Sequence, residues 1–248
     1  MRVSVIVPTH NEEAVILKTI AEVERVVSSY YDYEIIIVDD CSQDDTVHQI
    51  FKYEWKLMSL GKVKLVQKVY PSGKGAAIKT GFKMSNAFSD YIIVMDADLQ
   101  ISPKEIPTFF KLMELYDADV VIGNKRHDYS IVRYSLGRRL VSFGYHLLVK
   151  LLFGFSLRDT QCGLKIFKRG KLSLVMRNVC VKRFAFDLEV LVALRDNNVR
   201  VVDAPVAVRE AVGGGSVSLR TIQETFWDTI AVWWRHRQGW YADPLHSE

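Results

Sequence analysis

A short apolar run that ends in two aspartates constrains the fold of this chain more than any other segment. Residues 91–95 read Tyr-Ile-Ile-Val-Met, and residues 96–100 continue with Asp-Ala-Asp-Leu-Gln. An uninterrupted apolar run of this length is typical of a strand that is buried on both faces of a parallel sheet. Asp96 and Asp98 would then lie at the carboxyl end of the strand, which is where open α/β sheets bind ligands.

The spacing of the two aspartates indicates the kind of ligand. Side chains two residues apart on an extended backbone point the same way. We therefore expect Asp96 and Asp98 to face one hard cation, which would prefer oxygen ligands. The alternative is that this Asp-x-Asp sequence only caps a loop.

Three earlier segments repeat the pattern of an apolar strand followed by polar residues. Helices are expected from Glu12, around Val47 and Ile50, and from the Gly73–Gly75 loop to Ala87. Because strand and helix alternate four times in about 100 residues, the pattern predicts βαβ units and a mainly parallel sheet flanked by helices. The strands are predicted at residues 2–7, 33–38, 63–67 and 91–95.

Local signals place the ends of the first elements. Pro8 should end the first strand because proline has no N–H to donate to a neighbouring strand. Asn11 is the expected N-cap of the helix from Glu12, and Ser42 or Asp44 that of the next helix. The polar segments that follow the strands would share one edge of the sheet, which predicts a binding site there.

Taken in order, the motifs at these strand ends resemble those of the family 2 glycosyltransferases, which have the GT-A fold. They read Val-Ile-Val-Pro-Thr-x-Asn-Glu, Val-Asp-Asp-x-Ser, Gly-Lys-Gly and Met-Asp-Ala-Asp-Leu-Gln. The closest branch is that of the dolichyl-phosphate mannose and glucose synthases. A fifth motif at residues 158–167, together with residues 183–189, resembles the dolichyl-phosphate β-glucosyltransferases more than the mannosyl enzymes. The resemblance covers roughly residues 2–212.

The resemblance implies a domain division and a metal. Residues 1–212 would form a Rossmann-like catalytic domain, and residues 213–248 a C-terminal amphipathic, Trp-rich helical segment. Asp96 and Asp98, with Gln100 near them, would hold Mg²⁺ or Mn²⁺, both of which suit carboxylate and phosphate oxygens. The cation would neutralise the charge that grows on the leaving diphosphate of a nucleotide sugar.

The resemblance also implies a pocket for the base and ribose of the donor. His10 stands where relatives often have Tyr, and the alternative for Glu12 is an ordinary helix N-terminal charge. Asp40 is preferred over its structural neighbour Asp39. The implied donor-binding residues are Pro8, His10, Glu12, Val38, Asp40, Lys74, Asp96, Ala97, Asp98, Gln100, Lys125 and Arg209.

On the acceptor side, the resemblance implies cations that hold a lipid phosphate. Such a phosphate is already mostly ionised near neutral pH, so it needs positioning more than a strong base. Arg138 and Ser142 match the acceptor-phosphate pattern, and Arg209 could reach either substrate. Lys125 stands where relatives often have Arg, which replaces a bidentate contact by a point charge, and Arg126 could substitute for it.

Asp98, Arg138 and Asp159 are the expected catalytic residues. Asp159 is the only carboxylate close to these cations in a strong motif. Orientation of the site is its preferred role, with general base and structural cation ligand as alternatives.

Lys74 lies between Gly73 and Gly75, where a loop can bring its backbone close to a ligand. The spacing fails the dinucleotide fingerprint, because Ile78 occupies the place of the third glycine, and it also fails the P-loop pattern. A nicotinamide-dependent oxidoreductase is therefore disfavoured. Lys74 is expected to contact phosphate or order the loop, and a solvated lysine is the alternative.

Charge is divided unevenly along the chain. Residues 1–128 contain 15 Lys/Arg and 19 Asp/Glu, whereas residues 129–248 contain 18 and 10. A basic amphipathic helix is predicted at about residues 131–155, with an apolar stripe that includes Leu147 and Leu151. Such a helix can lie on an anionic membrane surface, or it can simply pack on the sheet.

The C-terminal segment combines tryptophans with cations. Trp233 and Trp234 stand beside Arg235 and Arg237, a composition that favours the headgroup zone of a bilayer. A homodimer interface is the alternative. We expect peripheral association with the cytoplasmic face of a membrane, because no segment approaches the ~20 apolar residues of a spanning helix.

The sequence thus predicts an inverting transferase that moves a hexose from a nucleotide sugar to dolichyl or polyprenyl phosphate. UDP-glucose is the preferred donor and GDP-mannose the alternative. A non-catalytic nucleotide-sugar-binding module is disfavoured, because such a module has no need of Asp96, Asp98 and Asp159 together. No nucleic-acid partner is expected.

Overall fold

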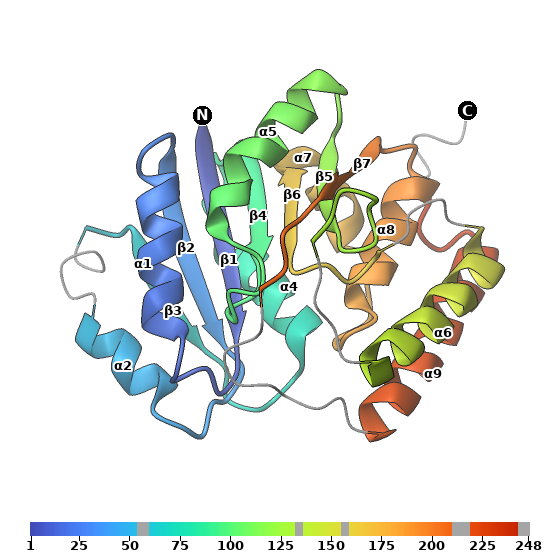
Figure 1. The fold of residues 1–248 in the computed structure, drawn as a ribbon, viewed down its shortest axis with the longest axis horizontal. Coiled ribbons are helices and arrows are strands. Elements are labelled where there is room, and N and C mark those ends of the chain that lie inside the picture. The colour runs from blue at the N-terminus through green and yellow to red at the C-terminus, as the bar shows by residue number, and fades with distance from the viewer. Residues whose placement is uncertain (54–59, 132–135, 155–158, 210–218, 243–248) are drawn as a thin grey trace.

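A computed structural model describes residues 1–53, 60–131, 136–154, 159–209 and 219–242 of the chain. Strands and helices alternate in the first part, as the sequence pattern predicts (Figure 1). The elements up to the paired aspartates are β1 (Arg2–Thr9), α1 (Ile16–Val27), β2 (Asp32–Asp39), α2 (Thr46–Tyr53), β3 (Val63–Gln67), α4 (Lys74–Met84) and β4 (Tyr91–Met95).

The second part completes the sheet and adds helices to both of its faces (Figure 1). Its elements are the 3₁₀ turn η1 (Pro103–Glu105), α5 (Ile106–Leu115), β5 (Val120–Asn124), α6 (Leu136–Phe153), β6 (Leu164–Lys168), α7 (Arg169–Met176), α8 (Phe186–Asp196), β7 (Val201–Pro205) and α9 (Leu219–Arg237).

The described strands form one seven-stranded sheet in the order β3-β2-β1-β4-β6-β5-β7. Strand β6 runs antiparallel to β4 and β5, and the other neighbouring pairs are parallel. The five-residue strands β3 and β7 form its two edges. The predicted α/β fold with a mainly parallel sheet is confirmed.

Burial on both faces explains the unbroken apolar runs of the central strands. Val5 and Ile37 enter a core with α1 and α5, whereas Ile6 and Ile36 enter a second core with α4 and α8. Because successive side chains of a strand point to opposite faces, most positions between two helical layers are apolar. The buried Ser4 and Glu34 are exceptions, and they are hydrogen-bonded to each other at 2.6 Å. In β4, all residues from Ile92 onward are buried.

Pro8 does not end the first strand, contrary to the expectation from its missing N–H. Strands β1 and β2 pair through Pro8 to Thr9. Strand β4 accompanies β1 only as far as Ile6, so one side of β1 has no paired strand at Pro8. Proline is tolerated in a strand at such an edge position.

The expected N-cap at Asn11 is also wrong, because α1 begins only at Ile16. Asn11 has a φ of 56°, and its side-chain oxygen accepts the N–H of Gln43 at 2.8 Å, which ties two loops together. Asp44 lies two residues before α2, and its carboxylate accepts the N–H of Thr46, the first residue of that helix, at 3.1 Å. The carbonyl of Asp45, not of Asp44, accepts the first helical hydrogen bond, from Gln49.

Helix α6 presents part of its predicted apolar stripe outward. Leu147 and Leu151 are 46% and 75% exposed, whereas Val149 and Phe153 are buried in the core. The helix begins at Leu136, later than the expected start near residue 131, and residues 132–135 lie outside the described part of the chain.

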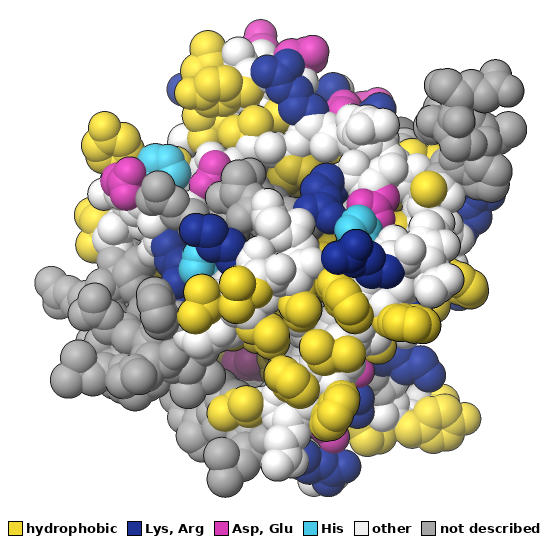
Figure 2. All heavy atoms as spheres, turned by 90° about the vertical axis from the view of Figure 1, so that its right-hand side faces the viewer, with side chains coloured by type: hydrophobic (Ala, Val, Ile, Leu, Met, Phe, Trp, Pro, Cys, Tyr) yellow, Lys and Arg dark blue, Asp and Glu magenta, His cyan; other side chains and the backbone are white. Residues whose placement is uncertain are grey.

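Helix α9 lies beside α6 and also packs on α8 (Figure 1). Trp227 and Trp234 are 67% and 60% exposed, but Trp233 is only partly exposed and packs against the core. Trp233 and Trp234 therefore do not share one exposed face, because adjacent residues of a helix point about 100° apart. The hydrophobic side chains gathered in Figure 2 lie on the side of the molecule that carries α6 and α9. Within the described residues, no helix has the length and apolar character needed to span a bilayer.

A buried carboxylate fastens the end of the chain to α8. Glu189 is fully buried and accepts hydrogen bonds from the Tyr241 hydroxyl at 2.6 Å and from the backbone N–H groups of Cys180 and Val181. The same tyrosine oxygen accepts a hydrogen bond from Arg235 Nε at 2.9 Å.

Replacing Tyr241 with Phe should lower the free energy of unfolding by about 1–3 kcal/mol, because the buried carboxylate loses a donor. Urea denaturation followed by circular dichroism measures the change. Tyr70→Phe, at a position that is 73% exposed, is the matched control. Equal stability of both variants would show that the Tyr241 hydroxyl does not hold the tail.

Candidate functional site

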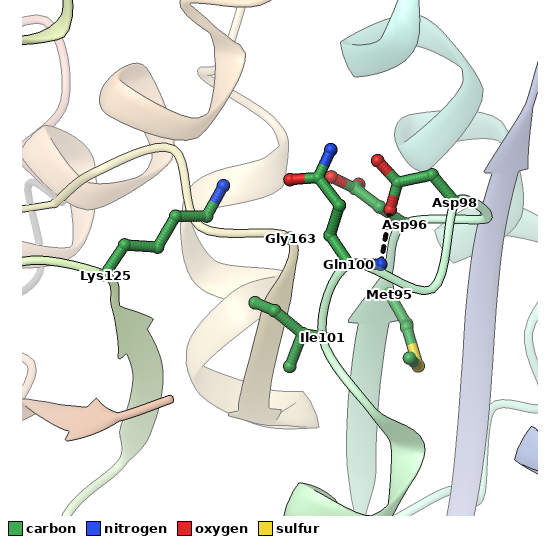
Figure 3. A pocket seen from close by; sticks show the side chains of 7 residues that line it. All are labelled: Met95, Asp96, Asp98, Gln100, Ile101, Lys125 and Gly163. Atoms are coloured by element: carbon green, nitrogen blue, oxygen red, sulfur yellow. Dashed lines mark hydrogen bonds between the residues drawn. The ribbon is translucent and has the colours of Figure 1, made fainter. Parts of the chain in front are cut away.

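A pocket opens at the carboxyl edge of the sheet, where β4, β5 and the start of β6 meet (Figure 3). The ends of the Asp96, Asp98 and Gln100 side chains gather on one side of the loop that follows β4, and Lys125 reaches toward them from the end of β5 (Figure 3). The residues that line the pocket are Met95, Asp96, Asp98, Gln100, Ile101, Lys125 and Gly163.

The loop after β4 holds the two aspartates through backbone hydrogen bonds. Asp96 donates its N–H to the Gly163 carbonyl at 2.9 Å, and Asp98 accepts the N–H of Gln100 at 3.0 Å. Leu99, which lies between Asp98 and Gln100, has a φ of 54°, so the chain turns there and does not continue as a strand. Strand β4 ends at Met95, so the two aspartates lie in the loop after the strand and not within the strand itself.

Gly163 allows Asp96 to take this position. A Cβ atom at residue 163 would lie 2.5 Å from one Asp96 carboxylate oxygen, well inside van der Waals contact. Any side chain at residue 163 would therefore displace the Asp96 carboxylate from the pocket.

Asp96 is paired with a lysine, which settles the structural role of Lys74 in this state. Lys74 Nζ lies 2.7 Å from Asp96 and 3.7 Å from Asp187. Burial alone would raise the pKa of Asp96, but the charge of Lys74 outweighs it and holds that pKa below the ordinary value. The alternative of a freely solvated lysine is wrong, because the Lys74 side chain is only 19% exposed.

The pKa values of two neighbouring carboxyl groups are shifted in the opposite direction. Burial and the charge of Asp96 raise the pKa of Asp98. Burial, followed by the charges of Asp98, Asp96 and Asp44, raises the pKa of Glu12 to about 7. Glu12 therefore belongs electrostatically to this cluster and is not merely a charge at the start of a helix.

These residues fit a divalent cation whose coordination a substrate would complete. Within the described part of the chain, no three Asp, Glu, His or Cys side chains form a full metal-ligand set. Mg²⁺ sites at phosphates often use only one or two protein carboxylates, with phosphate oxygens and water as further ligands. Asp96, Asp98 and the amide of Gln100 offer such a partial set, and the excess negative charge on Asp98 and Glu12 favours a cation.

Asp40 orders the neighbouring loop. Its carboxylate accepts the N–H groups of Ser72 and Gly73, at 2.9 Å and 2.7 Å, and the Ser72 hydroxyl at 2.8 Å. His10 Nδ1 lies 2.9 Å from the Asp40 carbonyl, which joins the ends of β1 and β2. The side chains of Asp40 and His10 therefore shape the edge of the sheet next to Lys74.

The other residues predicted to bind the donor lie along the same edge, but they differ in burial and in the groups that can reach a ligand. Val38 is fully buried in the core, so its side chain is not offered to the pocket. Ala97 is buried, and its carbonyl accepts the Thr19 hydroxyl of α1 at 2.5 Å. Pro8 is half-buried near the end of β1.

Asp159 joins two segments at the pocket. Its carboxylate accepts the backbone N–H groups of Lys125 and Gln161, each at 3.0 Å. The first bond fixes the end of β5, from which the Lys125 side chain enters the pocket, and Arg126 follows directly. This geometry agrees with an orienting role for Asp159.

Among the remaining acceptor candidates, the structure describes the side chain of Arg209 but not those of Arg138 and Ser142. Arg209 donates its backbone N–H to the Gln100 carbonyl at 2.8 Å, while its guanidinium lies 3.9 Å from Glu22 on α1. Arg138 and Ser142 belong to α6, but their side chains lie outside the described residues.

Sequence reasoning missed two residues that support the site. Lys165 and Asp187 are buried and form an ion pair at 3.0 Å, and Asp187 also faces Lys74. A lysine inside the apolar run of β6 and an aspartate at the start of an apolar helix were the available signals. Neither indicates its partner, because the two lie on separate elements.

The raised pKa of Glu12 predicts a pH dependence of stability. Between the ordinary value of 4.5 and about 7, the folded protein keeps a proton that the unfolded chain has lost. Rising pH therefore favours unfolding in this window, and the Glu12→Gln variant cannot show the effect. We expect the variant to gain stability relative to the unchanged protein from about pH 5 to about pH 8.

Urea unfolding without divalent cations measures this difference at several pH values. Glu114→Gln, at an exposed position of α5, is the control. A difference that does not grow with pH, or that grows equally in the control, would contradict the electrostatic coupling of Glu12 to the aspartates.

Comparison with known proteins shows the family to which the chain belongs. Residues 4–176 match the family model described as glycosyl transferase family 2. The dolichyl-phosphate beta-glucosyltransferase of Drosophila melanogaster is 30% identical over 262 residues, which cover 96% of this chain and 76% of the relative. That of Homo sapiens is 34% identical over 206 residues, which cover 77% of this chain and 62% of the relative.

A solved structure with the same fold is glucosyl-3-phosphoglycerate synthase from Mycobacterium tuberculosis, in complex with Mn²⁺, uridine diphosphate and phosphoglyceric acid. It superposes with a TM-score of 0.72 at 19% identity and covers 95% of this chain and 78% of its own. This likeness establishes the GT-A-like fold. The family match over most of the chain shows that this protein is a glycosyltransferase of family 2.

Proposed function

We propose that this glycosyltransferase transfers glucose from UDP-glucose to the phosphate of dolichol or a related polyprenol. The observation that carries the proposal is the pair Asp96 and Asp98 at a pocket whose other polar groups are Gln100 and Lys125. The names of the relatives favour a dolichyl phosphate acceptor and glucosyl transfer. The structural neighbour was solved with Mn²⁺ and a uridine nucleotide, which supports the same donor class.

On the donor side, Asp96, Asp98 and Gln100 would hold Mg²⁺ or Mn²⁺. When bound, the cation would supply neutralisation of the leaving diphosphate. His10, Asp40 and their neighbours at the ends of β1 and β2 would border the base and ribose. Lys125 would add a positive charge beside the diphosphate.

On the acceptor side, cations would hold the lipid phosphate next to the anomeric carbon. Arg138 and Ser142 of α6, with Arg126 and Arg209, are the proposed contacts. Asp159 would orient Lys125 and its loop through the hydrogen bond at 3.0 Å. The role of these residues is positioning, because an ionised phosphate is already a competent nucleophile.

The proposed reaction is a single displacement with inversion. A phosphate oxygen of the lipid forms a bond to the anomeric carbon from the face opposite the nucleotide. The bond from that carbon to the diphosphate breaks, and the electron pair leaves with UDP. An α-linked donor thereby gives a β-linked polyprenyl-phosphate sugar.

The lipid substrate would reach the site from a bilayer surface. Leu147 and Leu151 of α6 and Trp227 and Trp234 of α9 provide the exposed apolar face described above. Tryptophan rings favour the headgroup zone, and nearby cations add electrostatic attraction to anionic lipids. Peripheral association with the cytoplasmic face of a membrane remains part of this proposal.

Two alternatives predict different outcomes. A GDP-mannose-dependent enzyme would place label from GDP-mannose, not from UDP-glucose, in the organic phase with polyprenyl phosphate. A non-catalytic binding module would bind a nucleotide sugar without producing extractable label from either donor.

The Asp98→Ala variant should lose roughly 10²–10³-fold in transfer rate, because the leaving diphosphate loses charge stabilisation. The assay follows radiolabelled sugar from UDP-glucose into organic extracts that contain polyprenyl phosphate. Chelation of divalent cations should have the same effect, and Mn²⁺ or Mg²⁺ should restore activity. Glu114→Ala, on exposed α5, is the control, and full turnover in chelator would refute the metal-assisted reaction.

Double replacement of Trp227 and Trp234 by Ala should weaken binding to anionic liposomes, while activity on a short, soluble polyprenyl phosphate is retained. Binding of the unchanged protein should weaken as salt rises, because the electrostatic part is screened. Flotation measures binding, and Tyr30→Ala with Phe88→Ala, exposed at the other edge of the sheet, is the matched control. Failure of flotation to detect lipid binding at low salt would refute membrane association and favour a contact between two subunits at this face.

A further inference from the structure

Four charged side chains of alternating sign run from the interior to the pocket. Lys165 Nζ lies 3.0 Å from Asp187, Asp187 lies 3.7 Å from Lys74, and Lys74 lies 2.7 Å from Asp96. They come from four elements: β6, the start of α8, the start of α4 and the end of β4. The series ends on a carboxylate that the proposed function assigns to a cation.

Close packing of two helix starts fixes Lys74 in this series. A side chain at Gly75 would collide with Phe186, the first residue of α8. The Ala76 N–H donates to the Lys182 carbonyl at 2.9 Å, which ties α4 to the segment before α8. Lys74 and Asp187 are therefore held opposite each other by backbone contacts as well as by charge.

The lysine is needed while no cation is present. Asp98 and Glu12 are carboxyl groups that interact electrostatically with Asp96, and Lys74 gives Asp96 a close opposite charge at 2.7 Å. A divalent cation on Asp96 would compete with the Lys74 ammonium for the same carboxylate. Asp187 faces Lys74 with one carboxylate oxygen at 3.7 Å, and its other oxygen forms the ion pair with Lys165 at 3.0 Å.

We propose that Lys74 is an internal counter-ion of Asp96 that is exchanged for the divalent cation, and that Asp187 is the positioning residue that retains Lys74 after the exchange. The inference rests on the proposed cation site at Asp96 and Asp98. Loading with cation thus moves a positive charge from Asp96 toward Asp187 and does not release it into solvent. The ion pair with Lys165, at 3.0 Å, holds Asp187 in place.

Mn²⁺ binding measured by electron paramagnetic resonance tests the exchange without reference to turnover. Lys74→Met keeps the aliphatic stem but removes the competing charge, so it should bind Mn²⁺ roughly five- to tenfold more tightly than the unchanged protein. Asp187→Asn removes the second carboxylate beside Lys74, so the lysine should stay on Asp96 and Mn²⁺ should bind several-fold more weakly.

The double variant separates positioning from a general structural effect. If Asp187 acts through Lys74, Lys74→Met with Asp187→Asn should bind Mn²⁺ as tightly as Lys74→Met alone. An equal loss on both backgrounds would overturn the role of Asp187. Lys168→Ala is the control, because it also removes the lysine of an ion pair, in which Lys168 Nζ lies 3.0 Å from Asp119. It should leave the Mn²⁺ affinity unchanged.

The outcomes distinguish this inference from the function on which it rests. If Asp98→Ala binds Mn²⁺ as well as the unchanged protein does, the proposed cation site fails. If binding requires Asp98 but Lys74→Met is no tighter, the exchange alone is overturned. Absence of detectable binding to Lys74→Met at millimolar Mn²⁺ also overturns it. Circular dichroism establishes that each variant is folded, and the Lys74→Met comparison stands even if Asp187→Asn does not fold.

Discussion

Hydrogen bonds between β4 and the antiparallel strand β6 join the two parts of the sheet, and the pocket is built on that junction. The register pairs Met95 with Leu164, so the chain enters β6 where β4 ends. Gly163 therefore lies against Asp96 and accepts its N–H. Because β6 also pairs with β5, Lys125 is brought to the same pocket. A parallel strand in this place would begin at the opposite edge and would not supply these contacts.

The pairing of charges at this edge changes from the interior of the protein toward the pocket. Deep in the protein, Lys165 and Asp187 are paired, and burial of such a pair requires good geometry to offset desolvation. Toward the pocket, Lys74 forms an ion pair with Asp96. Asp98 and Glu12 instead have raised pKa values, mainly because they are buried. Of these two carboxyl groups, Asp98 lines the pocket and Glu12 interacts electrostatically with Asp98, and the proposed cation would offset their charge.

Much of this could be predicted from the sequence because it depends on local patterns. The unbroken apolar run before Asp96 located the strand end, and the repeated alternation gave the parallel sheet. Pairing of Lys74 with Asp187 could not be predicted, since it depends on contact between two helices that are distant along the chain. Pro8 was misjudged because its effect depends on which neighbouring strand is present. Helical periodicity alone would have predicted that Trp233 and Trp234 point in different directions.

The two edge strands have a consequence for how copies of this protein can meet. Strand β3 has five residues, and its Lys64 and the adjacent Lys62 are held in ion pairs with Glu34 and Asp32 of β2. Strand β7 is equally short and ends at Pro205, which has no N–H to donate. Short, charged or proline-containing edges disfavour edge-to-edge pairing and therefore fibrous aggregation. Neighbouring copies of this protein would thus not readily extend one sheet into the next.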